Sequence, residues 1–108
     1  MARILFICTS NQDRSPALEK HFRENYPENE YLSAGVNRYF TSKKGNHYLT
    51  KEDIEWAELI VYAERIHFDI SFRDFGELNN KDCIVLNLGE YKQGCIDDGY
   101  LLKAELKL

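Results

Sequence analysis

The sequence predicts an α/β fold: one three-layer domain, residues 1–108, in which helices cover both faces of a four-stranded parallel sheet. The first observation behind this prediction is a set of four short apolar segments bounded by polar or turn-forming residues, a pattern typical of buried strands. They are Arg3–Cys8, Glu30–Ser33 running into Ala34-Gly35, Leu59–Ala63 and Cys83–Leu88. The second is that segments with helical spacing alternate with these strands, which indicates right-handed crossovers between parallel strands.

The first helix is expected to start directly after the first strand. Ser15 is a suitable N-cap, because its hydroxyl can accept a hydrogen bond from a backbone N–H of the first turn, and Pro16 suits the first helical position. Apolar residues then recur at helical spacing. The helix should end near Tyr26-Pro27, since the residue before a proline disfavours the helical conformation.

Two further signals place the remaining helices. Thr50, followed three residues later by Asp53, is close to a capping box and predicts a helix start. Apolar residues at helical spacing predict a short helix over Ile66–Phe75 and a terminal helix over Gly99–Leu108. The segment Val36–Tyr48 is polar and aromatic without a clear period, so we expect a long loop there.

The composition is that of an ordinary soluble chain. Its 108 residues are 44% hydrophobic and 30% charged, with a net charge of −4, which argues against nucleic acid or an anionic membrane surface as a partner. No stretch approaches the roughly 18 apolar residues that span a bilayer, and no signal peptide is recognisable, so we expect a cytoplasmic protein. The 3 cysteines lack CxxC spacing and indicate reduced thiols rather than a disulfide framework or a zinc site.

The segment after the first strand carries most of the functional argument. Five residues separate Cys8, at the end of that strand, from Arg14, and a helix start follows. In an open α/β sheet, ligands bind at the carboxyl ends of the strands, where helices leave. Loop amides and the free N–H groups of a helix start can converge there on one anion, and a guanidinium matches phosphate oxygens. The same dipoles favour the nucleophilic thiolate form of a cysteine.

This segment, Cys8–Pro16, resembles the signature of the low-molecular-weight protein tyrosine phosphatases: a strand, then Cys-x5-Arg-Ser-Pro, then a helix. Ser33-Ala34-Gly35 matches the Ser-Ala-Gly that follows the family's second strand, and Leu49–Ile60 matches its next helix and third strand. Asp98-Gly99-Tyr100 falls where the family carries Asp-Pro-aromatic. The resemblance covers nearly the whole chain and is nearest to a short bacterial branch of predicted phosphatases.

The resemblance implies a two-step phosphoryl transfer that needs no metal and no other cofactor. Cys8 would attack phosphorus and form a cysteinyl-phosphate, Arg14 and the loop amides would hold the equatorial oxygens, and Asp98 would protonate the leaving group. Ser15 would donate a hydrogen bond to the thiolate, and Asn11 would brace the loop. The implied phosphate-binding loop consists of Thr9, Ser10, Asn11, Gln12, Asp13 and Ser15.

The family's substrates imply the partner, which is a phosphorylated protein or a small aryl phosphate. Tyr39, Phe40 and Tyr100 lie where the family places the walls of its slot for a phenyl ring. Each of these residues on its own is also compatible with simple packing. His21 and His47 show no metal-ligand spacing, nor does His67, and we expect all three on the surface or on helix faces.

Three positions depart from the family pattern. The family usually has glycine at Ser10, and a positive φ there would strain a serine by about 1–2 kcal/mol. It usually has a second cysteine at Asp13, where an acid beside the arginine opposes anion binding. Gly99 replaces a proline, and Asp97 competes with Asp98 for the role of general acid.

Two alternatives remain open at the level of sequence. Thiol-dependent arsenate reduction on the same fold would need resolving cysteines, for which Cys83 and Cys95 are the candidates. A non-catalytic phosphate-binding module would keep the cradle and lack turnover, with Asp13 and Gly99 as traces of lost chemistry.

Overall fold

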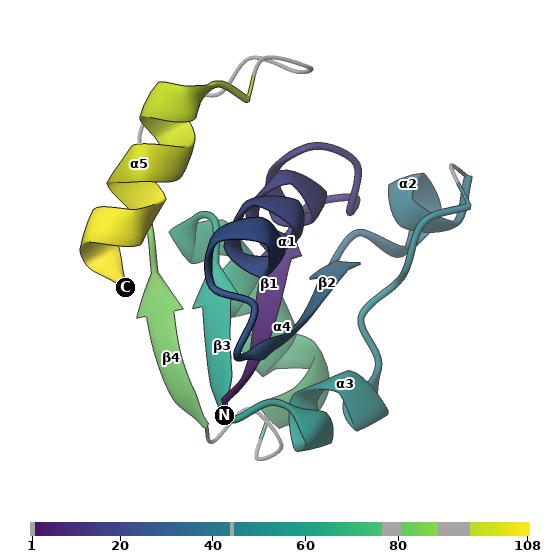
Figure 1. Ribbon diagram of the computed structural model, residues 1–108. Helices are drawn as coiled ribbons and strands as arrows, with labels where there is room; N and C mark the ends of the chain where they lie inside the picture. The colour runs from purple at the N-terminus through teal and green to yellow at the C-terminus, as the bar shows by residue number, and fades with distance from the viewer. Residues whose placement is uncertain (1, 44, 77–80, 89–95) are drawn as a thin grey trace.

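The computed structural model describes residues 2–43, 45–76, 81–88 and 96–108 (Figure 1). Strands and helices alternate along most of the chain. In order, they are β1 (Arg3–Cys8), α1 (Arg14–Asn25), β2 (Glu30–Gly35), α2 (Arg38–Lys43), α3 (Lys51–Trp56), β3 (Leu59–Tyr62), α4 (Arg65–Phe75), β4 (Asp82–Val85) and α5 (Asp98–Lys107).

The four strands form one parallel sheet, as the sequence predicts, and their order in it is β2-β1-β3-β4. The central strand β1 pairs with both β2 and β3. Its last residue, Cys8, is level with Gly35 at the end of β2, and Ile7 is level with Tyr62 at the end of β3. The carboxyl ends of three strands therefore meet at one edge of the sheet, and Cys8 lies at that edge.

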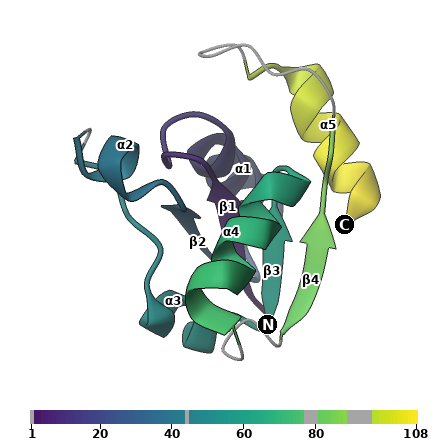
Figure 2. The same ribbon diagram turned by 180° about the vertical axis from the view of Figure 1, so that it is seen from behind.

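Each face of the sheet buries its own hydrophobic cluster, because successive side chains along a strand point to opposite faces. Leu5, Ile7, Ile60 and Tyr62 lie in the cluster that also takes in Ile54 of α3. The other cluster joins alternate strand residues to α1 and α5; its buried members are Phe6, Leu18, Phe22, Tyr31, Val61, Leu86 and Ala104. Figures 1 and 2 show α1 and α5 on one face and α4 on the other, so the predicted α/β architecture is confirmed.

The first helix starts two residues earlier than the sequence predicts. Arg14 is its first residue and Asp13 is the N-cap, without a side-chain cap hydrogen bond. The prediction that Ser15 caps this helix is therefore wrong. Its hydroxyl lies inside the first turn and bonds to Cys8 and Asn11 instead, a set of contacts that local capping rules do not anticipate.

The predicted loop over Val36–Tyr48 contains the helix α2, which the sequence did not indicate. This helix is stabilised by local polar hydrogen bonds rather than by the burial of an apolar face. Asn37 Oδ1 accepts a hydrogen bond from Phe40 N at 2.9 Å, and Thr41 Oγ1 donates to Asn37 O at 2.6 Å. Only Thr41 is buried, so no hydrophobic period marks the segment.

The other boundaries agree with the predictions to within a few residues. Thr50 and Asp53 form the predicted capping box at the start of α3. The strand β4 ends at Val85 rather than Leu88, and Asn87 has a φ of 47°, which is incompatible with an extended strand.

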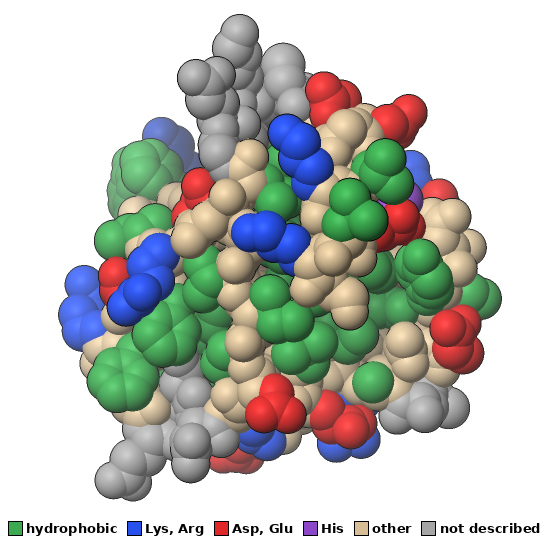
Figure 3. All heavy atoms as spheres, turned by 90° about the vertical axis from the view of Figure 1, so that its left-hand side faces the viewer, with side chains coloured by type: hydrophobic (Ala, Val, Ile, Leu, Met, Phe, Trp, Pro, Cys, Tyr) green, Lys and Arg blue, Asp and Glu red, His purple; other side chains and the backbone are tan. Residues whose placement is uncertain are grey.

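The last helix packs on the sheet through part of its surface only. Ala104 is fully buried, whereas Leu102, Leu106 and Leu108 are exposed. Figure 3 shows hydrophobic side chains interspersed with charged ones on the side of the molecule where α5 lies in Figure 1. Among the described residues, no helix combines the length and the apolar character needed to cross a membrane.

Candidate active site

Cys8 is a buried thiol at the carboxyl edge of the sheet, with 3% of its surface exposed. Its Sγ lies 3.0 Å from Ser15 Oγ, in the first turn of α1. Residues Cys8–Arg14, which we call the Cys8 loop, connect the central strand to that helix. The nucleophile candidate and the helix N-terminus are thus brought together by adjacent segments of chain.

Asn11 is the brace of the Cys8 loop. Its Nδ2 donates to Ser15 Oγ at 3.0 Å and to Ser33 Oγ at 2.9 Å, and its Oδ1 accepts from His47 N at 3.1 Å. Ser33 Oγ in turn donates to Glu19 Oε1 at 2.7 Å. One buried side chain therefore links the loop to α1, to β2 and to the segment after α2.

Asn11 also adopts the unusual backbone conformation of the loop, with a φ of 56°. Asparagine tolerates this left-handed region better than most residues. Ser10 does not lie in that region, so the condition under which a serine would be strained there is not met. The left-handed turn falls one residue later than the family's glycine suggested.

The glycine of Ser33-Ala34-Gly35 is required by close approach of the Cys8 loop. A Cβ at Gly35 would lie 2.7 Å from Asn11 N, 2.7 Å from the carbonyl carbon of Ser10 and 2.5 Å from Thr41 Oγ1. Real Cβ atoms do not approach backbone so closely. The end of β2 can therefore pack against the backbone of the Cys8 loop only because Gly35 has no side chain.

The segment around α2 holds the same loop from its other side. Thr9 O accepts a hydrogen bond from Asn37 N at 2.8 Å, and Ser10 O accepts one from Asn46 Nδ2 at 3.2 Å. Backbone carbonyls of the loop are thereby engaged with protein donors. These carbonyls are therefore occupied, and in loops of this kind the backbone groups that bind an anion are the N–H groups.

His67 is a part of the site that the sequence did not reveal. It is 1% exposed, so the expectation of a surface or helix-face residue is wrong. Its Nε2 lies 2.9 Å from Thr9 Oγ1, and its Nδ1 accepts from Glu64 N at 3.0 Å. Burial and, secondarily, the charge of Arg14 lower the pKa of His67 to about 4. Glu64 and His67 form a capping box at the start of α4, and their spacing of three residues is the sequence signal that could have indicated it.

Arg14 is the first residue of α1 and is half-buried. Its Nη2 donates to Thr9 Oγ1 at 3.4 Å. Asp13 and Gln12, which precede it, are also half-buried. The guanidinium thus lies at the Cys8 loop, next to the threonine that follows the cysteine.

The acid candidates lie at the start of α5. Asp97 and Asp98 are both exposed. Asp97 Oδ1 accepts a hydrogen bond from Tyr100 N at 2.9 Å and so caps the helix, whereas Asp98 is its first residue. The carboxylate of Asp97 is thus engaged with the backbone, which distinguishes it from Asp98, the acid that the resemblance implies.

The three slot candidates occupy different environments. Tyr39 and Phe40 project from α2 with 66% and 49% of their surfaces exposed, and their rings pack edge to face. Tyr100 is half-buried, and its hydroxyl is buried without a hydrogen-bond partner among the described residues. Burial raises the pKa of Tyr100 to about 12. Arg14 has a smaller effect that lowers this pKa, and Glu64 and Cys8 have smaller effects that raise it. These charges place Tyr100 within electrostatic reach of the Cys8 loop.

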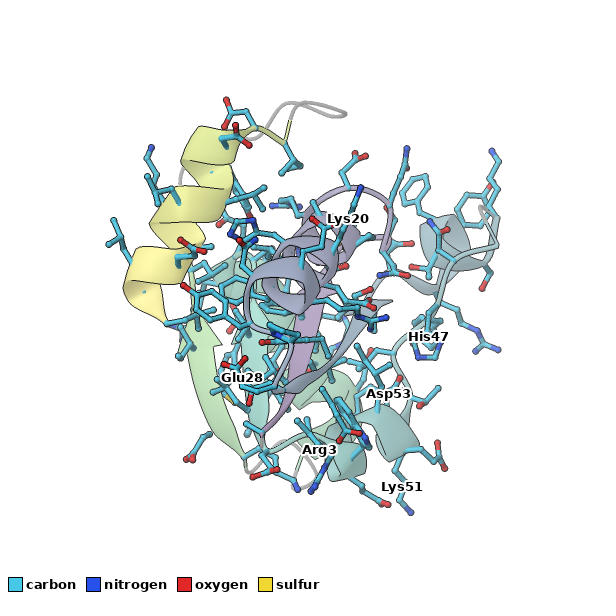
Figure 4. All side chains as sticks on the ribbon, viewed as in Figure 1. Arg3, Lys20, Glu28, His47, Lys51 and Asp53 are labelled. Atoms are coloured by element: carbon cyan, nitrogen blue, oxygen red, sulfur yellow. The ribbon has the colours of Figure 1, made fainter. Side chains whose placement is uncertain are left out.

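The side chains of the other two histidines bond to acidic side chains rather than to the Cys8 loop. His47 Nε2 is 2.7 Å from Asp53 Oδ2, and Figure 4 shows the two side chains next to each other between α2 and α3. His21 Nε2 is 2.8 Å from Glu105 Oε1, which joins α1 to α5. Within the described ranges, no three histidine, cysteine or acidic side chains are grouped so as to hold a metal ion.

The fold and the buried cysteine at the end of β1 together define a class of protein. A parallel α/β sheet with a cysteine loop after its first strand is the arrangement of the low-molecular-weight protein tyrosine phosphatases, as the sequence resemblance indicated. No family model matches the chain, and no curated protein matches it. The likeness is found among solved structures.

Three of these structures illustrate it. The YwlE arginine phosphatase of Geobacillus stearothermophilus is 26% identical, with 99% of this chain and 86% of that one covered at a TM-score of 0.70. The low-molecular-weight protein tyrosine phosphatase of T. tengcongensis is 23% identical, with coverages of 98% and 92% and a TM-score of 0.72. Vibrio vulnificus Wzb, in complex with benzylphosphonate, is 16% identical, with coverages of 97% and 90% and a TM-score of 0.73. The likeness to YwlE, at 26% identity, supports a phosphatase on this fold, and the other two structures show the fold.

Proposed function

We propose that this chain is a cysteine-dependent phosphatase that hydrolyses phosphotyrosine or aryl phosphate monoesters through a cysteinyl-phosphate. The observation that carries the proposal is the position of Cys8. Its buried Sγ lies 3.0 Å from the Ser15 hydroxyl at the start of α1, within a loop whose carbonyls bond to surrounding protein. A hydroxyl donor and a helix N-terminus both favour the thiolate over the thiol.

In the first step the thiolate of Cys8 attacks phosphorus. The S–P bond forms as the bond from phosphorus to the leaving oxygen breaks, and that oxygen takes a proton from Asp98. Arg14 and the N–H groups of the loop bind the equatorial oxygens, over which the charge of the transition state is spread. In the second step Asp98, now a carboxylate, takes a proton from water as the water oxygen attacks phosphorus and releases the thiolate.

Asp98 suits the acid role better than Asp97. The Asp97 carboxylate accepts the hydrogen bond that caps α5, whereas Asp98 is exposed in the first turn of that helix. The half-buried Tyr100, two residues further on, stands within electrostatic reach of Cys8 and Arg14. We propose that Tyr100, with Tyr39 and Phe40 on α2, flanks the leaving group of the substrate.

A solved relative supports a covalent intermediate at this position of the fold. Another YwlE arginine phosphatase structure, 24% identical, is that of a cysteine-to-serine mutant whose active-site serine is phosphorylated. The hydroxyl that replaces a thiol there carries phosphate. We infer the same connectivity, protein side chain to phosphorus, for Cys8 here.

The YwlE comparison also favours a second substrate class, phosphorylated arginine. The G. stearothermophilus and Bacillus subtilis YwlE chains are 26% and 25% identical to this one. A phosphoramidate is cleaved with the same in-line attack by Cys8, and its leaving nitrogen also needs a proton. Phosphotyrosine and phosphoarginine therefore belong in one assay.

Arsenate reduction is less well supported. Cys83 is half-buried in β4, where burial and then Asp82 raise the pKa of its thiol, which disfavours attack by a thiolate. Cys95, the other resolving candidate, lies outside the described residues.

The test is hydrolysis of p-nitrophenyl phosphate, phosphotyrosine and phosphoarginine by the intact chain, Cys8→Ser and the matched thiol control Cys83→Ser. We expect turnover in the intact chain and in Cys83→Ser, with a loss of at least 10³-fold in Cys8→Ser, because the nucleophile is removed. Mass spectrometry of the quenched reaction should find one phosphate on Cys8.

Two results would contradict the proposal. Turnover that survives in Cys8→Ser would exclude this cysteine as the nucleophile. An intact chain whose melting temperature rises with phosphate, but which turns over none of the three substrates, would identify a phosphate-binding module instead.

A further inference from the structure

The hydroxyl of Thr9 lies between two nitrogen donors. His67 Nε2 is 2.9 Å from Thr9 Oγ1, and Arg14 Nη2 donates to the same oxygen at 3.4 Å. A hydroxyl oxygen accepts two hydrogen bonds and donates one. The direction in which the Thr9 hydroxyl donates therefore depends on which nitrogen of His67 carries the proton.

The backbone fixes that choice. Glu64 N–H can only donate, and it points at His67 Nδ1 at a distance of 3.0 Å. In a neutral imidazole one nitrogen accepts and the other carries hydrogen, so Nε2 is the protonated nitrogen. His67 accordingly donates to Thr9 Oγ1. The low pKa of His67, caused by burial and Arg14, agrees with a neutral ring.

With two donors on its oxygen, Thr9 keeps its own hydrogen for a third group. Thr9 directly follows Cys8, and its backbone carbonyl is held by Asn37 N at 2.8 Å, so the residue is fixed on both sides. An anion bound in the Cys8 loop would supply an acceptor for this hydrogen.

We propose that His67 is a positioning residue of the oxyanion site: its Nε2–H, together with Arg14, orients the Thr9 hydroxyl so that it donates to an oxygen of the bound phosphoryl group. This deepens the proposed function, on which it rests for the identity of the anion. A residue of α4, far along the chain, thereby sets the hydrogen-bonding direction of a residue next to the nucleophile.

The experiment is a double-mutant cycle on oxyanion binding. Thr9→Val removes the hydroxyl at nearly constant volume, and His67→Leu removes the donor. Thr9→Ser and His67→Gln keep a hydroxyl and a nitrogen donor, respectively, and His21→Gln is a control at a histidine that bonds to Glu105 instead. Tungstate affinity is measured by calorimetry on each folded variant, and KM and kcat are measured with p-nitrophenyl phosphate.

We expect Thr9→Val and His67→Leu each to weaken tungstate about tenfold, the size of one hydrogen bond to a charged group. The double variant should lose little more than either single, because both remove the same donated bond. Thr9→Ser and His67→Gln should recover most of the affinity, and His21→Gln should match the intact chain.

A purely structural His67 would behave differently. His67→Leu would then lower the melting temperature and leave the tungstate affinity of the folded protein unchanged. Alternatively, the fold-loss of tungstate affinity in the double variant would equal the product of the losses in the two single variants. Either result overturns the proposal. If His67→Leu does not fold, His67→Gln and Thr9→Val decide: an unchanged affinity in Thr9→Val overturns it.

The binding readout keeps this proposal separate from the proposed function. An intact chain that binds tungstate without turnover refutes the phosphatase, and the cycle on affinity still decides the role of His67. If the intact chain has turnover but the losses of tungstate binding free energy in the two single variants add up in the double variant, the role of His67 is refuted and the proposed function stands. Absence of tungstate binding in the intact chain overturns the positioning role outright.

Discussion

The Cys8 loop and the start of α5 supply the two halves of the proposed chemistry, and the protein holds them in different ways. The loop is enclosed: Asn11 and Ser15 are buried, and their side chains bond to β2 and α1. The start of α5 is open, with Asp97 and Asp98 exposed and one capping hydrogen bond. Both lie at the edge of the sheet where the strands end (Figure 1).

The difference matches what each half has to do. A site that stabilises charge works best when its donors are fixed before the anion arrives, since they then need no reorganisation. A group that gives a proton to a leaving group and takes one from water works in contact with solvent. The comparison shows that, among the described residues, the buried supporting contacts are concentrated around Cys8.

The largest expected effect concerns the exposed half. Asp98→Asn should lower kcat by about 10²-fold or more with a poor leaving group such as phenol, because general acid catalysis is removed. Asp97→Asn should retain activity, since asparagine caps a helix as well as aspartate does. Steady-state kinetics with phenyl phosphate and p-nitrophenyl phosphate check this. The reverse order of the two variants would make Asp97 the acid.

The next effect concerns the buried support of the loop and its dependence on pH. The pKa of His67 is about 4 in the folded chain, lowered by burial and Arg14, against an ordinary 6.5 when unfolded. Between these values the unfolded chain binds more protons, so stability is full above pH 6.5 and falls as the pH drops towards 4. The loss amounts to roughly 3 kcal/mol.

Chemical denaturation of the intact chain and of His67→Gln at pH 7.5, 5.5 and 4.5 measures this contribution of His67 to the free energy of unfolding. The difference in unfolding free energy between the two proteins should shrink as the pH falls. Glu64 and Arg14 flank the imidazole and are present in both proteins, so the comparison isolates the histidine. A constant difference across the pH series would refute a neutral buried His67.

A third prediction compares glycines in the two regions. Gly35→Ala should destabilise the chain by about 1–3 kcal/mol and weaken phosphate binding, because its Cβ would lie 2.7 Å from backbone atoms of the Cys8 loop. Gly99→Ala, in the first turn of α5, is the matched control. Among the described residues, its Cβ would meet one atom, Asp97 Oδ1 at 3.3 Å, and alanine is the better helix former. Thermal unfolding with and without phosphate measures both, and equal losses would contradict the comparison.

The smallest effect concerns the loop's own backbone. Ser10→Gly restores the residue typical of the family, yet Ser10 is not in the left-handed region, so no strain is relieved. We expect a loss of about 0.5–1 kcal/mol from the added freedom of the unfolded chain. A gain in the free energy of unfolding would show that the serine is strained after all.

The sequence by itself determined the architecture and the place of Cys8 in it. Apolar runs separated by helical segments predict a parallel sheet, and the strand that ends at Cys8 and leads into a helix places the thiol at the functional edge. The capping box of Thr50 and Asp53 was equally readable. These features are local, because they depend on residues within a few positions of each other along the chain.

Only the tertiary structure decided how the loop is held. The contact between His67 and Thr9 spans 58 residues, and the one between Asn11 and His47 spans 36, so no periodicity or spacing announces them. Those contacts stabilise Asn11 rather than Ser10 in the left-handed conformation, and they bury a histidine expected on the surface. The physical reason is that a buried polar group requires a partner, and the fold, not the neighbouring sequence, brings that partner to it.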